Sequence, residues 1–134
     1  MKGQSSMEFL AYISFTMLIL AALYTVMIQQ QQANLNEQTR NTATMVANRV
    51  SFEVEMALVQ GEGYSRVFAL PTRVGGHNYT VELKRGSAVV GYGNKSIITD
   101  SRYRGKPISA SVGDDSNVLR VKHNASGVNL LVAN

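Results

Sequence analysis

The sequence has no cysteine and no tryptophan, and its only prolines are Pro71 and Pro107. Without cysteine, neither a disulfide framework nor a cysteine-based metal site can form. Any exported domain must therefore be held together by burial alone. Glycine is absent between Gly3 and Gly61, so the first sixty residues contain almost nothing that would break a helix.

Charge is also missing from residues 9–28, an apolar run that only Ser14, Thr16 and Thr25 interrupt. About 20 apolar residues are enough for a helix to cross a bilayer. The run leads into four glutamines without a turn signal, and we expect one helix from about Ser5 to Gln60, ended by Gly61 and Gly63.

Glu8 directly precedes the apolar run, and a carboxylate in that position is costly in a membrane. The residues around it, 2–9, read Lys-Gly-Gln-Ser-Ser-Met-Glu-Phe. This pattern resembles the class III signal peptide of archaeal type IV pilins, which are adhesion-type pilus subunits. The resemblance covers residues 2–28 and nothing after them.

The resemblance implies how the chain is processed and assembled. A prepilin peptidase would cut between Gly3 and Gln4, which leaves residues 1–3 as a leader. The mature subunit would leave the cytoplasmic membrane and form a homopolymer, an extracellular pilus, with the help of an assembly ATPase and a membrane platform. In the filament core, Glu8 would be offset by the α-amine of Gln4, because an unpaired buried charge is too costly.

Other interpretations of the apolar run remain open. A secretory signal peptide has a shorter apolar region, about 7–15 residues, before its cleavage site. A single-pass anchor that never polymerises fits the length, and a minor or tip pilin fits the motif. The length disfavours a buried core helix.

Two apolar stripes are expected on residues 45–59 of the helix. One comprises Val46, Val50, Val54, Ala57 and Leu58, and the other Met45, Phe52, Met56 and Val59. Arg49 and Glu53 separate the stripes on one side. Two opposed stripes indicate two partners, namely the chain's own head and neighbouring subunits; a helix enclosed in a larger core is the alternative.

From residue 64 the apolar period changes from helical to alternating, which predicts strands. The expected strands are residues 65–70, 79–84, 88–92, 96–99, 108–112, 119–122 and 128–133. The predicted fold class is α+β: a long helix (residues 4–60), then a small antiparallel β-sheet or sandwich head (residues 64–134). The head carries ten basic and four acidic residues, whereas residues 4–62 carry two and five.

The head offers little for catalysis, and we predict that the chain is no enzyme and binds no metal or cofactor. His77 and His123 lack a second ligand at metal spacing. Asp114 and Asp115 resemble a polar turn more than a calcium loop, which would need a glycine and a terminal glutamate.

Three sequons lie at expected turns of the head, at Asn78, Asn94 and Asn124. They predict an N-glycosylated, outward-facing surface. The head's basic residues could attract anionic surfaces, but no nucleic-acid motif accompanies them, so nucleic acid is not an expected partner. These residues are Arg66, Arg73, Lys84, Arg85, Arg102, Arg104 and Lys106, with Tyr92 and Tyr103 among them.

Overall fold

The computed structural model describes the backbone of residues 2–133 and the side chains of residues 5–133. Helix α1 spans Lys2–Gln60, and strands β1 to β7 follow it. The chain divides into two compact units, Met1–Glu37 and Gln38–Asn134. The fold is α+β, as the sequence predicts.

Helix α1 ends where the sequence first supplies glycine. The Gly61 amide donates to the Ala57 carbonyl at 3.2 Å, and Gly61 has φ +85°, a left-handed conformation that favours glycine. Gly63, with φ +92°, then donates its amide to the His123 carbonyl at 3.0 Å. The two glycines turn the chain from the helix into the first strand.

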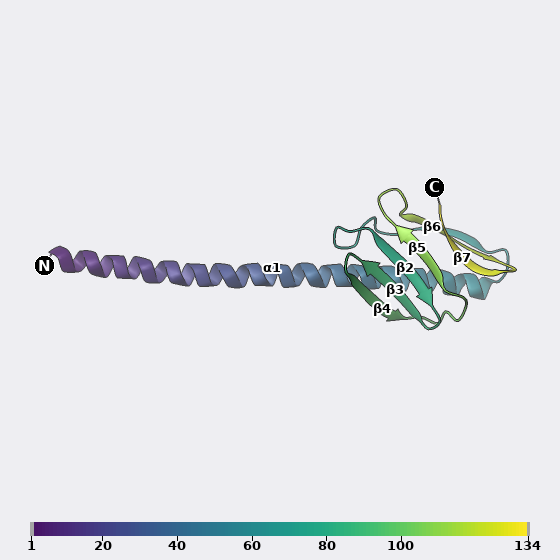
Figure 1. Cartoon of the computed structure of the whole chain (residues 1–134), viewed down its shortest axis with the longest axis horizontal. Helices are drawn as coiled ribbons and strands as arrows, with labels where there is room; N and C mark the ends of the chain where they lie inside the picture. The colour runs from purple at the N-terminus through teal and green to yellow at the C-terminus, as the bar shows by residue number, and fades with distance from the viewer. Residues whose placement is uncertain (1, 134) are drawn as a thin grey trace. The chain divides into compact units, whose positions relative to one another are not determined.

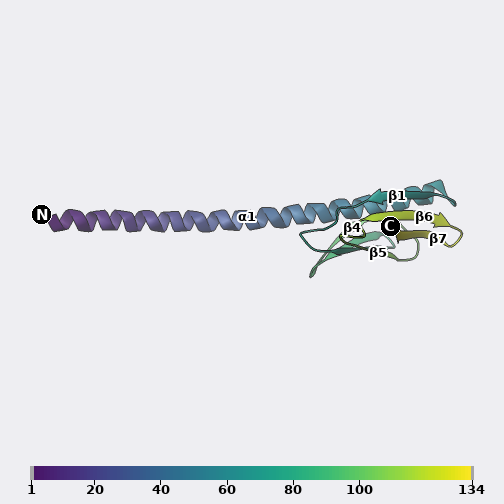
Figure 2. The same cartoon turned by 90° about the horizontal axis from the view of Figure 1, so that it is seen from above.

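Strands β2, β3, β5, β6 and β7 alternate in burial because each buries one face, whereas β1 buries only Phe68 and β4 has no buried residue. Their bounds are β1 Ser65–Ala69, β2 Tyr79–Lys84, β3 Ser87–Tyr92, β4 Lys95–Asp100, β5 Ile108–Val112, β6 Val118–Asn124 and β7 Gly127–Val132. All pairings between them are antiparallel. The strands form a three-stranded sheet in the order β1-β6-β7 and a four-stranded sheet in the order β4-β3-β2-β5. In Figure 2, β1 lies alongside the end of α1.

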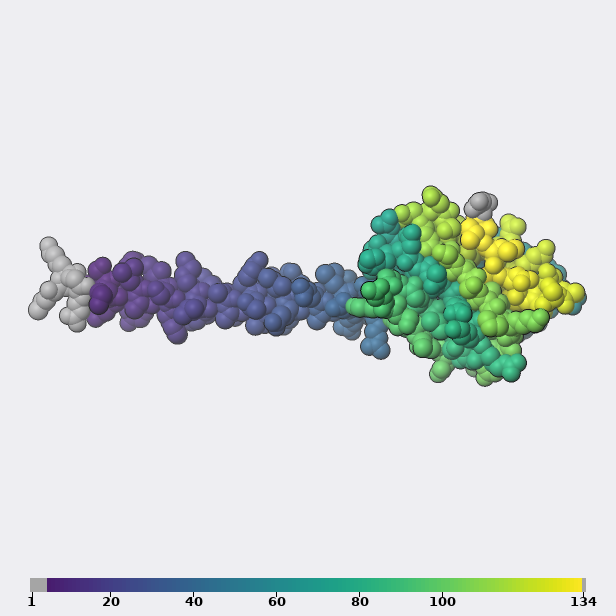
Figure 3. Space-filling model, in the orientation of Figure 1, coloured from purple at the N-terminus to yellow at the C-terminus, as the bar shows by residue number. Residues whose placement is uncertain are grey.

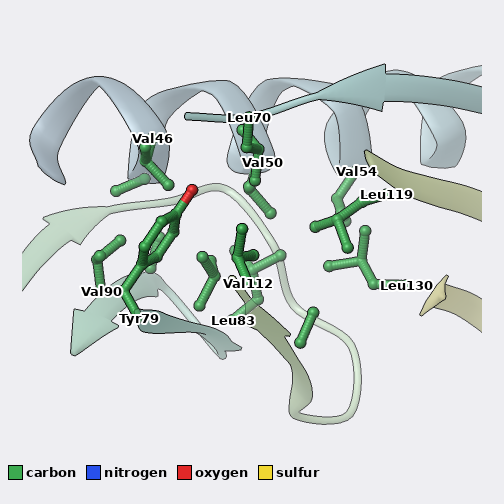
Figure 4. Close-up of a cluster of buried hydrophobic side chains, with 14 of the residues drawn as sticks. Val46, Val50, Val54, Leu70, Tyr79, Leu83, Val90, Val112, Leu119 and Leu130 are labelled. Atoms are coloured by element: carbon green, nitrogen blue, oxygen red, sulfur yellow. The ribbon is translucent and has the colours of Figure 1, made fainter. Parts of the chain in front are cut away.

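The second half of α1 completes the core of the head. Ala43, Val46, Val50, Val54 and Ala57 are almost fully buried by the inner faces of both sheets. Figure 4 shows these valines facing strand residues such as Tyr79, Leu83, Leu119 and Leu130. Side chains of the strands and loops cover most of this part of the helix in Figure 3. So small a head needs the helix, because two small sheets alone enclose little apolar volume.

The first unit, Met1–Glu37, consists of helix alone. Every side chain described in it is exposed, and these include the large apolar residues of the run at 9–28. By length and composition, α1 is the one helix of the described chain that could cross a membrane. An apolar surface of this extent requires lipid or protein around it.

Candidate assembly and surface sites

The residues of the predicted cleavage and assembly motif lie at the start of α1. Gly3 and Gln4 belong to the helix, but their side chains lie outside the described residues. Glu8 is exposed on the first turns of the helix, immediately before the apolar run. Its contact with the Gln4 amine in a filament therefore stays a prediction.

The serine and threonine hydroxyls of the apolar run are satisfied within the helix. Ser14, Thr16 and Thr25 each donate to the carbonyl four residues earlier, at 2.8, 2.8 and 2.9 Å respectively. Such back-bonding removes the cost of placing a hydroxyl in an apolar environment. The serine and threonine side chains thus leave no unpaired hydroxyl in the run; its other hydroxyls belong to Tyr12 and Tyr24, which are exposed.

The second half of α1 has the two faces that the sequence predicts, with two errors, at Leu58 and at Glu53. Val46, Val50, Val54 and Ala57 are buried, whereas Leu58, expected beside them, is 41% exposed. Leu58 points toward the covered side, but it lies in the last turn of the helix. There it forms one wall of an open groove with Tyr103, residues 105–108 and residues 126–129. The head therefore covers the end of the helix only in part.

The opposite face of this half of α1 is an outward apolar stripe: Met45, Phe52, Met56 and Val59. Phe52 is 51% exposed, Val59 is 80% exposed and Met56 is half-buried. Met45 also lines a mainly apolar groove of about 280 Å³, together with Ala69, Leu70 and Pro71. Within the described chain, Met45, Phe52 and Val59 of this stripe stay exposed.

Glu53 lies in the core instead of at the border between the two stripes. Its side chain is fully buried, and the carboxylate pairs with the half-exposed guanidinium groups of Arg49 and Arg66, at 3.3 and 3.4 Å. Neither of its oxygens has a well-directed hydrogen bond in the described structure. At about 100° per residue, Glu53 points only about 20° away from Val46, which explains its burial. The Arg66 partner comes from β1 and could not be found from helical spacing.

The three sequons are all exposed, but their side chains differ. Asn94 lies in the turn between β3 and β4, after Gly93. The amide of Asn78 packs over Gly113, where a Cβ atom would come within 3.1 Å of its Nδ2. Asn124 Oδ1 accepts hydrogen bonds from the Ser126 amide and hydroxyl, at 3.2 and 2.7 Å. Glycosylation of these residues stays a prediction.

The histidines and aspartates of the head make structural contacts. His123 Nδ1 lies 2.9 Å from the Ala57 carbonyl and ties β6 to the end of α1, while His77 is exposed in a turn. Asp114 accepts two hydrogen bonds from Arg73, which lower the pKa of the carboxyl and raise that of the guanidinium. Among the described residues, no group of three His, Asp or Glu is arranged to hold a metal ion.

Comparison with known proteins returned no match: no family model, no curated protein and no solved structure resembles this chain closely enough to be reported.

Proposed function

We propose that this chain is the structural subunit of an adhesion-type archaeal type IV pilus, a filament polymerised through helix α1. A prepilin peptidase cuts the precursor between Gly3 and Gln4 in the cytoplasmic membrane. The assembly ATPase and its membrane platform then transfer the subunit to the extracellular filament. The head faces outward to carry glycans and to attach to surfaces or other cells.

The observation that carries this proposal is the pair of unburied apolar surfaces on one helix. A lipid bilayer would cover residues 9–28, and that alone would make the chain an anchored surface module. It would not cover the outward stripe of Phe52, Met56 and Val59, which lies on the helix of the β-rich unit. A protein partner is needed there, and copies of the same helix supply one.

The first experiment determines the N-terminal residue and the form of native material sheared from cells. Chains that begin at Gln4 in thin filaments are the expected result. Intact chains that begin at Met1, found only in the membrane fraction, would overturn the proposal in favour of the anchored module.

Glu8 then tests the assembly step. We expect Glu8→Ala to insert into the membrane normally and to yield no filaments, because its carboxylate no longer pairs with the Gln4 amine of a subunit. Glu62→Ala is the matched control, since it removes another exposed acid, in the turn after the same helix, and should leave filaments intact. Electron microscopy of sheared fractions detects filaments of both variants. Normal filaments from Glu8→Ala would exclude a role for Glu8 in assembly.

A minor or tip subunit is the second candidate within the same biology. It predicts that the chain is a small fraction of purified filaments, which mass spectrometry of those filaments measures.

A further inference from the structure

Basic residues that are separated in the sequence meet at one corner of the head. The turn between β2 and β3 is bound to the connection between β4 and β5: the Gly86 amide donates to the Tyr103 carbonyl at 2.8 Å, and the Ser101 amide to the Gly86 carbonyl at 3.1 Å. Both segments lie at the same end of the four-stranded sheet in Figure 1. We name this the basic corner; its residues are Lys84, Arg85, Arg102, Arg104 and Lys106.

The acids near the basic corner neutralise it only in part. Glu82 pairs with Lys84 at 3.1 Å, and Glu55 accepts a hydrogen bond from the Arg102 amide at 2.9 Å. Asp100 is the other acid of these segments. In the described structure the side chains of Arg85, Arg102 and Lys106 make no ion pair, and all three are exposed. Positive charge therefore remains in excess there.

A groove of about 390 Å³ adjoins the basic corner and shares Lys106 with it. Leu58, Ile108 and Val128 supply apolar walls, and Ser126 and Asn129 supply hydrogen-bonding groups. The Tyr103 hydroxyl shapes its rim by donating to the Lys106 carbonyl at 2.6 Å. A Cβ atom on Gly105 would come within 2.3 Å of that hydroxyl, so glycine is required for the rim.

We propose that the basic corner and this groove bind an acidic polysaccharide, with uronate carboxylates on Arg102 and Lys106 and sugar rings against the groove. This inference rests on the proposed function, because it assumes an outward-facing head. Binding sites for small organic groups combine apolar walls with a few polar contacts, and guanidinium groups pair well with carboxylates. Single-stranded nucleic acid would need exposed aromatic side chains for stacking, whereas Tyr103 is 2% exposed.

The test measures binding of the full chain, in detergent, to polygalacturonate, to neutral dextran and to single-stranded DNA. The native glycosylated chain and a chain produced without glycosylation are both tested, because Asn124 Oδ1 lies 3.4 Å from Asn129 Nδ2 at the groove. Binding by the unglycosylated chain alone would overturn the proposal for the native head. We expect binding to polygalacturonate and none to dextran. Arg102→Gln with Lys106→Gln should weaken it at least about tenfold, since two charge-assisted hydrogen bonds are lost.

Lys95→Gln with Arg120→Gln is the matched control: it removes the same charge from exposed positions on β4 and β6 and should change the affinity less than about twofold. If both double variants lost affinity for polygalacturonate equally, general electrostatic attraction would explain the binding, and the proposed site would be wrong. Tighter binding of DNA that depends on Arg102 and Lys106 would overturn it in favour of nucleic acid, and no binding would overturn it outright. Filament assembly is measured separately from binding. Arg102→Gln with Lys106→Gln should still form normal filaments, so a failure to bind polysaccharide would overturn the binding site without contradicting the proposed pilus function.

Discussion

Glu53 shows how one buried charge constrains the head. Its carboxylate has no access to water, while Arg49 and Arg66, its two partners, are each about half exposed. If an arginine is removed, the carboxylate stays buried with less compensation; if the carboxylate is removed, the arginines can still be hydrated. Removing an arginine should therefore lower the free energy of unfolding more than removing the carboxylate.

We expect Arg66→Ala to lower the free energy of unfolding by about 1–3 kcal/mol and Glu53→Met, which keeps the volume, to lower it less. Chemical unfolding of the full chain in detergent, followed by circular dichroism, measures both. Arg120→Ala, on the exposed face of β6, is the control and should change stability by less than about 0.5 kcal/mol. A larger loss from Glu53→Met than from Arg66→Ala would show that the ion pairs stabilise the fold by more than the burial of the carboxylate costs.

Tyr79 makes the stability of the head sensitive to high pH. Burial raises its pKa to about 12, and its hydroxyl donates to the Pro71 carbonyl at 2.7 Å. In the unfolded chain the tyrosine ionises near pH 10. The unfolded state thus loses its proton first, so the stabilisation is complete below about pH 10 and is lost as the pH rises toward 12.

Unfolding midpoints measured between pH 8 and 12 should therefore fall above pH 10, and fall less steeply in Tyr79→Phe. Tyr12→Phe, at an exposed position of the first unit, is the control and should follow the wild-type curve. If Tyr79→Phe also followed the wild-type curve, the alkaline loss would come from other groups, such as Tyr103, whose pKa burial also raises.

At the scale of elements, the outward stripe of α1 is the feature that distinguishes a polymer from an anchored module. Phe52→Asp places a charge at the centre of this stripe. Because Phe52 is 51% exposed in the single chain, we expect its unfolding midpoint to be nearly unchanged and filament formation to be lost.

The control for this variant is Ser111→Asp, which adds the same charge at an exposed position of β5, away from the stripe. It should form filaments, which sedimentation and electron microscopy detect. Filaments from Phe52→Asp would mean that the stripe faces solvent or another partner in the assembly.

The elements were largely predictable because each has a simple local cause. The absence of glycine and proline extends α1 to Gln60, and alternation defines the strands to within one or two residues, as for β5 at Ile108–Val112. The division of the strands into two sheets was not predictable, since it depends on pairings between distant segments. The burial of Glu53 follows from its direction, about 20° from Val46, but its partner Arg66 comes from β1 and could not be predicted from helical spacing. The basic corner was also not predictable, because it depends on contacts between distant segments: the hydrogen bonds of Gly86 with Tyr103 and Ser101 bring its two segments together.

For the whole molecule, local stability should differ sharply between the two units. Residues 43–57 hold their amides in a helix whose inner face is buried, whereas the described side chains of Met1–Glu37 are all exposed. In a bilayer nanodisc, lipid would protect residues 9–28 but not the glutamine-rich segment that follows. Hydrogen exchange of the single chain should therefore show a rapidly exchanging segment at residues 29–37, between two protected ones, because an exposed helix opens with little loss of contacts.

Polymerisation changes that expectation in a specific way. If copies of α1 pack against one another, residues 29–37 become enclosed by neighbouring helices, and their exchange should slow by at least about tenfold in the filament. The amides of β4, an edge strand of the four-stranded sheet, should change less if the head faces outward. Slowing confined to β4, with residues 29–37 still exchanging rapidly, would indicate that heads and not helices hold the subunits together, and it would contradict the helix-based assembly proposed for this chain.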